Sequence, residues 1–238
     1  MSLKKLFLKK KLTYKLYLYY NLYIRHKCYL KRSQYSQWGE DQFISNYFKD
    51  KSDGVYLDIG CFHPFMYSNT CLLHKKGWHG INIDINPTSI DLFNISRPRD
   101  INLCTTISDK KKKFNIFYDD PFSPVNTLDR KFYDKLKVKP VKDKKKLTVE
   151  SKSIEEILEI SQINKNIDFI NIDVEGMDYK ILQKININQL KPKLITIETH
   201  NVDGSEAENF NLIVKYLLEN NYTIHKRVGP STIFSFND

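Results

Sequence analysis

Alternating apolar and polar runs predict a series of strands and helices from residue 54 onward. The strand-like runs are 55–60, 80–85, 101–107, 168–173, 194–199, 222–227 and 231–236. The helix-like stretches between them are 68–76, 88–94, 153–160, 177–184 and 205–220. Continuous apolar runs such as FINI are typical of strands that are buried on both faces, as in parallel sheets.

The order of these elements predicts the fold class. Five strands separated by helices indicate an open, doubly wound, parallel α/β sheet. Only residues 228–230 join the last two strands, so these must form an antiparallel hairpin at the sheet edge. A mostly parallel seven-stranded sheet with this hairpin is the Rossmann-like arrangement of class I methyltransferases. Residues 109–150 interrupt the pattern and are predicted to form an exposed hairpin and a mobile insertion, or lid, over the ligand crevice.

Residues 1–32 differ from the body, 33–238, in charge. They carry ten Lys and Arg residues and no acid. Subtracting these ten from the 38 in the chain leaves 28, which equals the number of Asp and Glu residues. A neutral body argues against nucleic-acid binding, which needs a basic face.

Within residues 1–32, apolar side chains at helical spacing predict a basic amphipathic helix: Leu8, Leu12, Leu16, Tyr19 and Tyr23. Two interpretations stay open. The helix could lie on an anionic membrane surface, or it could pack on the body or on a second subunit. Its longest apolar stretch is shorter than the ~20 residues that a membrane span needs. The four cysteines form no CxxC pair, which favours a reducing cytoplasm, with peripheral contact at the inner membrane face as the alternative.

A first candidate site follows the first two strands. Asp58 and Gly60 end one strand, and Asp84 ends the next. A dinucleotide site needs the pattern GxGxxG, but this chain has DIGCFHP, where Phe62 and Pro64 would obstruct a pyrophosphate. S-adenosylmethionine carries no phosphate; its cationic groups suit carboxylates, its ribose suits Asp84, and one glycine lets it pass the backbone. The residues therefore predict a phosphate-free nucleoside.

Four stretches carry a resemblance to a known family: YSQWGEDQFISNYF (35–48), GVYLDIGCFHPFMYSNTCLLHKKGWHGINIDINP (54–87), DFINIDVEGMDYKIL (168–182) and LITIETHN (194–201). In order and spacing they resemble the FkbM-type methyltransferases over roughly 33–236, although Asp84 stands where the family commonly shows glutamate. The resemblance implies an S-adenosylmethionine-dependent O-methyltransferase acting on sugars, natural products or other small hydroxylated acceptors. It also implies the cofactor contacts Gln37, Glu40, Asp58, Gly60, Ser68, Asn69, Asp84 and Asn86.

A second candidate site follows the fourth and fifth strands of the parallel set. Asp173 and Glu175 lie just past one strand, and Glu198, His200 and Asn201 lie at the end of the other. Two chemistries fit. A carboxylate (Asp173 or Glu175) or His200 could act as general base toward a hydroxyl. Alternatively, Asp173, Glu198 and Asn201 could hold a divalent cation such as Mg²⁺, a pattern similar to the catechol O-methyltransferase type.

The leading hypothesis is methyl transfer from S-adenosylmethionine to a hydroxyl of a sugar, nucleotide-sugar or glycan precursor. One alternative is a lipid-linked or other small-molecule acceptor, with residues 1–32 as a membrane contact. Another is a non-catalytic nucleoside-binding module, which the clustered acids argue against. His63 is a weaker candidate for a residue that faces the acceptor.

Overall fold

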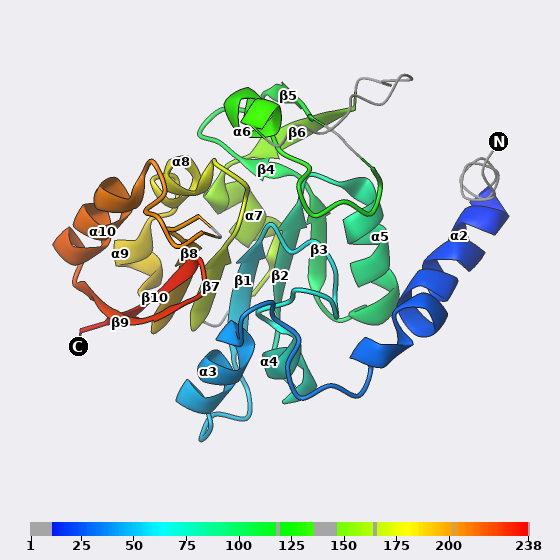
Figure 1. The fold of residues 1–238 in the computed structure, drawn as a ribbon, viewed down its shortest axis with the longest axis horizontal. Coiled ribbons are helices and arrows are strands. Elements are labelled where there is room, and N and C mark those ends of the chain that lie inside the picture. Colours follow the sequence, from blue (N-terminus) through cyan, green and yellow to red (C-terminus); the bar gives the residue numbers. More distant parts are fainter. Residues whose placement is uncertain (1–10, 118–119, 136–146, 164–165, 202, 238) are drawn as a thin grey trace.

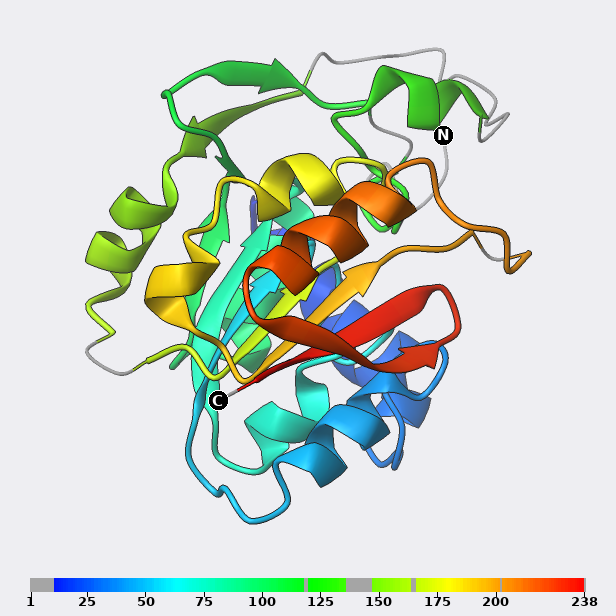
Figure 2. The same cartoon turned by 90° about the vertical axis from the view of Figure 1, so that its left-hand side faces the viewer.

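The computed structural model describes residues 11–117, 120–135, 147–163, 166–201 and 203–237. Within these ranges a seven-stranded sheet is covered by helices on both faces, and a three-stranded sheet lies beyond one end of its strands (Figures 1 and 2). The strands of the large sheet are β1 (Val55–Ile59), β2 (His79–Asp84), β3 (Ile101–Cys104), β7 (Phe169–Ile172), β8 (Leu194–Glu198), β9 (Tyr222–Val228) and β10 (Ser231–Phe236).

The spatial order of these strands is β3-β2-β1-β7-β8-β10-β9. The first five are parallel, and β10 is antiparallel to both β8 and β9. The predicted parallel sheet with a final antiparallel hairpin is therefore confirmed. After β3 the chain returns to the middle of the sheet, so the order reverses between β1 and β7. Ligands of such sheets bind at this reversal, outside the carboxyl ends of the strands.

Alternate side chains of β1 pack on opposite faces of the sheet. Val55, Leu57 and Ile59 join the main core, together with apolar residues of α7 (Ile154–Ser161), α8 (Asp178–Leu182) and α10 (Phe210–Glu219). Tyr56 joins a second cluster with residues of α3 (Glu40–Tyr47) and α4 (Cys71–Lys75). All five positions of β1 are buried, because helices cover both faces.

Two helix starts follow from capping side chains. A capping box begins α7, since Ser153 Oγ accepts from the Glu156 amide and the Glu156 carboxylate accepts from the Ser153 amide. Asn86 caps α5 (Pro87–Ser96) by accepting from the Thr88 amide at 3.0 Å. The short α9 (Ile187–Leu190) precedes β8.

Two predicted elements have different bounds. The run 101–107 breaks at Thr105, whose hydroxyl donates to the Glu150 carbonyl and whose amide donates to the Asp84 carbonyl. The chain thereby leaves the large sheet, and β4 (Thr106–Ile107) pairs with β6 (Thr148–Lys152) instead. The helix expected from 205 begins at Phe210, because residues 205–207 fold back onto residues 199–201.

The predicted insertion contains regular structure in its described part. β5 (Lys113–Asn115) pairs antiparallel with β6, as the predicted hairpin requires, and α6 (Arg130–Lys135) follows a loop. In Figure 1 these elements lie above the upper ends of β1, β2 and β7. The KDKKK run lies outside the described residues.

The N-terminal segment is helical in its described part: α2 (Lys11–Tyr20), η1 (Asn21–Arg25) and η2 (Lys27–Tyr29). Figure 1 shows α2 beside α5, on the outer side of the molecule. Leu18 and Leu22 form its buried side, whereas the predicted apolar positions Leu12 and Leu16 are exposed. Leu8 lies outside the described residues. No described helix is long and apolar enough to cross a membrane.

Candidate functional site

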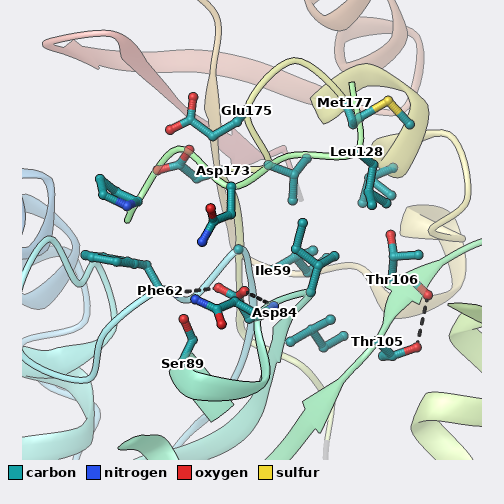
Figure 3. A pocket seen from close by; sticks show the side chains of 18 of the residues that line it. Ile59, Phe62, Asp84, Ser89, Thr105, Thr106, Leu128, Asp173, Glu175 and Met177 are labelled. Carbon is teal, nitrogen blue, oxygen red and sulfur yellow. Dashed lines mark hydrogen bonds between the residues drawn. The ribbon is translucent and has the colours of Figure 1, made fainter. Parts of the chain in front are cut away.

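A cavity with an empty volume of about 570 Å³, part of which is open solvent, lies at the carboxyl ends of β1, β2 and β7. Figure 3 shows Asp84 and Phe62 on one side of it and Asp173 and Glu175 on another. Its lining is drawn from the strand ends, the start of α5 and the insertion: Ile59, Gly60, Phe62, Ile83, Asp84, Ile85, Asn86, Ser89, Thr105, Thr106, Ser123, Pro124, Asn126, Leu128, Asp173, Val174, Glu175, Met177 and Ile181.

Gly60 is the first residue of the turn after β1. Its φ of +85° lies in the left-handed region, and a Cβ there would stand 1.7 Å from the Asp173 carbonyl oxygen. From the sequence, a glycine was expected here because it lets the cofactor pass close to the backbone. The structure gives a different reason: the backbone that follows β7 already occupies the space that a side chain at Gly60 would need. Gly60 still lines the cavity.

Asp84 is held by the backbone with its carboxylate in the cavity wall. One oxygen accepts from the Phe62 amide at 2.9 Å and the other from the Asn86 amide at 2.7 Å. Burial raises the pKa of Asp84 to about 6, against the opposing effect of these two hydrogen bonds. Asn86 also donates to the Pro121 carbonyl at 2.8 Å, which ties the insertion to the start of α5.

Asp58 does not line the cavity. Because side chains alternate along β1, it points to the opposite face from Ile59, where it accepts from Thr70 Oγ1 at 2.7 Å and from Asn171 Nδ2 at 2.9 Å. Asn69 donates to the same Asn171 side chain. The prediction that Asp58 and Asn69 contact a cofactor stays a prediction.

Sequence reasoning missed a buried arginine below the turn that follows β1. Arg97 is fully buried and donates to Tyr56 Oη, Thr70 Oγ1, Ser68 Oγ and the Pro64 carbonyl. Ser68, a predicted cofactor contact, therefore helps to hold the loop after β1 in place through its hydrogen bond with Arg97. Nothing in the pattern RPRD distinguishes an arginine inside the protein from one on its surface.

The loop after β7 carries most of the acidic side chains of the cavity. Burial, followed by the negative charge of neighbouring carboxylates, raises the pKa values of Asp173, Glu175 and Glu198 well above the usual range. Asp173 keeps contact with solvent in the open cavity, so water offsets part of that shift. Asp178 accepts from the amides of Val174 and Gly176 and so fixes the loop.

Glu40, from the segment before the first strand, lies near the acidic group formed by Asp173, Glu175 and Glu198. It is 3% exposed, and its oxygens accept from the Trp38 amide at 3.0 Å and Ser231 Oγ at 3.2 Å. Its charge contributes to the raised pKa values of Asp173 and Glu198. Gln37, predicted from the same motif, is exposed.

His200 and Asn201 lie outside the cavity lining. His200 is buried, with Nδ1 2.8 Å from Thr199 Oγ1 and its ring against Phe210. Asn201 donates to Ser205 Oγ within an exposed loop. The catalytic role of His200 stays a prediction.

The predicted divalent-cation set has no support from this geometry. Among the described residues, no group of three or more His, Cys, Asp or Glu side chains is placed to hold a metal ion. The amide of Asn201 is engaged in its own loop. Ligation by Asp173, Glu198 and Asn201 therefore stays a prediction.

His63 lies in a neighbouring cavity rather than in the one described above. Its Nδ1 accepts from the amides of Phe65 and Met66, so Nε2 carries the proton and donates to Asn21 Oδ1 at 3.2 Å. Burial lowers its pKa to about 3, which keeps the ring neutral. This histidine supports the turn and its contact with the N-terminal segment.

Two residues of the insertion contact the acidic loop. Thr127 Oγ1 donates to the Glu175 carbonyl at 2.8 Å, and the Phe132 side chain lies against Gly176. Glu175 has a φ of +53°, a conformation that costs energy for a residue with a side chain. The hydrogen bond from Thr127 helps to hold that conformation.

The lining of the cavity determines which ligands suit it. Among the described residues it contains three carboxylates, from Asp84, Asp173 and Glu175, and neither Lys nor Arg. Carboxylates close to one another are stabilised by a bound cation. A pyrophosphate would find no cationic partner among these residues, so the cavity suits a ligand with positive charge.

Comparison with known families adds one finding. A family model described as the methyltransferase FkbM domain matches residues 53–224. This range includes the entire lining of the cavity and omits Gln37, Glu40 and the N-terminal segment. No curated protein matches the chain.

Proposed function

The chain belongs to the FkbM methyltransferase domain family, and on that premise we propose that it is an S-adenosylmethionine-dependent O-methyltransferase. The proposed acceptor is a hydroxyl of a sugar, nucleotide-sugar or glycan precursor, in keeping with the resemblance of the sequence. We further propose that the seven-stranded sheet is of the class I methyltransferase type, which its strand order and final hairpin support.

One observation carries the choice of cofactor: a cavity at the point where the strand order reverses, whose described lining residues include three acids and no basic side chain. S-adenosylmethionine combines a sulfonium and an ammonium with a neutral nucleoside, so its charge is complementary to these carboxylates. A nicotinamide dinucleotide would bring two phosphates to the same lining. The absence of the second and third glycines of GxGxxG supports the same choice.

The residues present fit distinct parts of this cofactor. Asp84, whose two oxygens are fixed by backbone amides, would accept hydrogen bonds from the ribose hydroxyls. Asp173 and Glu40 would face its positive groups. When bound, the cofactor supplies an activated methyl group on a sulfonium. The protein then has to position a hydroxyl in line with it and to exclude water.

A carboxylate of the acidic loop is the proposed general base. Glu175 lines the cavity and has a raised pKa, so once ionised it holds a proton more strongly than an ordinary carboxylate. It would accept the proton of the acceptor hydroxyl as the new carbon–oxygen bond forms. The placement of His200 outside the lining favours the carboxylate over the imidazole.

A transfer assay tests the proposed reaction. The purified chain is incubated with S-adenosylmethionine labelled in its methyl group and with a panel of nucleotide-sugars and free sugars. We expect label in a product that resists alkaline hydrolysis, as an ether does and an ester does not. Label confined to nitrogen or sulfur atoms of other acceptors would contradict O-methylation. Cofactor binding without transfer to any tested acceptor would favour a binding module.

A further inference from the structure

The N-terminal segment presents an apolar stripe to the outside. Its exposed side chains have exposed fractions between 40% and 74%: Leu12, Leu16, Tyr19, Tyr20, Tyr23 and Ile24. Along α2 and η1 these positions recur every three to four residues, so they share one side of the helix. We call this set the outer stripe.

Apart from Tyr23, whose ring centroid lies 6.5 Å from that of Phe65, the outer stripe is not the side by which the helix packs on the body. Leu18 and Leu22 are buried against Leu92 of α5, and Tyr14 Oη donates to Asp91 Oδ2 at 2.7 Å. These contacts fix the orientation of the helix. The stripe is therefore held outward in the part of the chain that the structure describes.

The charged residues of the segment that carries the outer stripe are all basic. Exposed basic side chains accompany it along residues 12–32: Lys15, Arg25, Lys27, Lys31 and Arg32. The first carboxylate of the sequence is Glu40, and residues 1–32 account for the whole net charge of +10. An apolar stripe on a segment whose charged side chains are all cationic is complementary to a surface that is apolar inside and anionic at its boundary.

We propose that the outer stripe docks on an anionic lipid bilayer. The leucines and isoleucine enter the boundary between headgroups and acyl chains, while Lys and Arg contact anionic headgroups. The tyrosines suit the same depth, because their rings are apolar and their hydroxyls remain hydrated. Since no described helix can span a membrane, the attachment lies on the surface.

The docked segment borders the insertion over the proposed active site. The ring of Tyr17 contacts that of Phe122 at a centroid distance of 5.4 Å, and the next residue, Ser123, lines the cavity. Asn21 accepts from His63, which holds the turn after β1. Docking therefore places the insertion beside the lipid surface. The inference goes beyond the proposed reaction and does not depend on it.

Vesicle flotation of the full chain tests the docking. Vesicles of phosphatidylcholine with about one third phosphatidylglycerol are compared with vesicles of phosphatidylcholine alone. We expect flotation with the anionic vesicles, and we expect it to weaken as salt rises from roughly 0.05 to 0.5 M, because screening reduces headgroup attraction. Equal flotation with both vesicles, or none with either, would overturn the proposal.

Two matched variants distinguish an effect of the outer stripe on flotation from a general effect of exposed apolar side chains. Leu12→Glu/Leu16→Glu/Ile24→Glu removes three exposed apolar side chains of the stripe. Leu212→Glu/Leu218→Glu/Ile224→Glu removes the same residue types, 47–50% exposed, from α10 and β9. We expect the first variant to lose at least roughly 100-fold in partition coefficient and the second to bind like the original chain.

Two outcomes of this comparison contradict the proposal. The first is flotation of both variants like the original chain. The second is a stripe variant that changes only the oligomeric state, measured by sedimentation equilibrium without vesicles, which would make the stripe a contact between copies. Circular dichroism and thermal unfolding verify that both variants fold. Binding of S-adenosylhomocysteine, measured on the same proteins, reports on the proposed cofactor site separately.

Discussion

The Cβ position of Gly60 lies 1.7 Å from the carbonyl oxygen of Asp173, so the turn after β1 and the acidic loop after β7 meet backbone to backbone. A side chain at Gly60 would force the two strand ends apart. Because both segments line the cavity, this contact also sets the position of Asp173 relative to the turn.

We predict that Gly60→Ala lowers the free energy of unfolding by at least about 3 kcal/mol or prevents folding, since backbone strain and a clash add together. Gly77→Ala is the matched control. Gly77 also has a positive φ, +101°, but its nearest non-neighbouring atom would be 3.5 Å from the new Cβ. It should lose only about 1–2 kcal/mol. Urea denaturation measures both, and equal losses would contradict the close contact.

Asp84 is predicted to bind the ribose. Asp84→Asn keeps the shape but removes the charge and one acceptor, so the affinity for S-adenosylhomocysteine should fall roughly 10- to 100-fold. Asp203→Asn changes an exposed carboxylate outside the cavity lining and should leave the affinity unchanged. Isothermal titration measures both constants. Unchanged binding by Asp84→Asn would remove Asp84 from the cofactor site.

Glu175 is predicted to be the general base. Glu175→Gln should lower kcat for methyl transfer by roughly 100-fold or more while the affinity for S-adenosylhomocysteine changes by less than about threefold. His200→Gln, a change outside the lining, should keep most of the activity. The reverse ranking of the two variants would make the imidazole the base.

The raised pKa values of the buried carboxylates predict that the ligand-free protein loses stability as pH rises. The reference pKa of Asp84 and Asp178 is 3.8, and burial raises both to about 6 in the folded state. Glu175 and Glu198 shift in the same direction. Histidines with a lowered folded-state pKa, such as His63 and His74, have the opposite effect below about pH 7. Above about pH 7 the histidines are neutral in both states, so the folded state binds more protons than the unfolded state, and the free energy of unfolding decreases with pH.

Thermal unfolding between about pH 7 and pH 9 checks this sign, with roughly 2–4 °C in Tm for each kcal/mol. Glu175→Gln/Glu198→Gln should flatten the decline, because two of the groups that bind the extra protons are removed. A Tm that rises over this range in the original chain would contradict the raised pKa values.

Sequence reasoning predicted the strands well because their apolar runs are continuous and turn residues bound them. The pairs β1–β2 and β7–β8 follow from the parallel order, so the convergence of Asp84 with Asp173 and Glu175 around one cavity could be expected. The prediction for Asp58 did not take account of the alternation of side chains along β1. Its place in β1 puts it on the face opposite to Ile59, where a hydrogen-bonded network occupies it.

The remaining features depend on tertiary contacts that no local pattern contains. Arg97 is buried because Tyr56, Ser68 and Thr70 converge on it from distant segments. The outward side of the N-terminal helix could not be derived from spacing alone, since leucines occur on both of its sides. Leu18 and Leu22 are buried because Phe65, Leu92 and Phe122 happen to meet them.

Isothermal titration calorimetry with S-adenosylhomocysteine tests the central claim most directly. It is run with and without a chelator, and NAD is the control ligand. The account predicts saturable binding of S-adenosylhomocysteine, no binding of NAD, and loss of affinity in Asp84→Asn. A chelator effect would restore the cation hypothesis for Asp173 and Glu198. Binding of NAD in preference to S-adenosylhomocysteine, or binding of neither, would contradict the assignment of the cavity to a phosphate-free nucleoside.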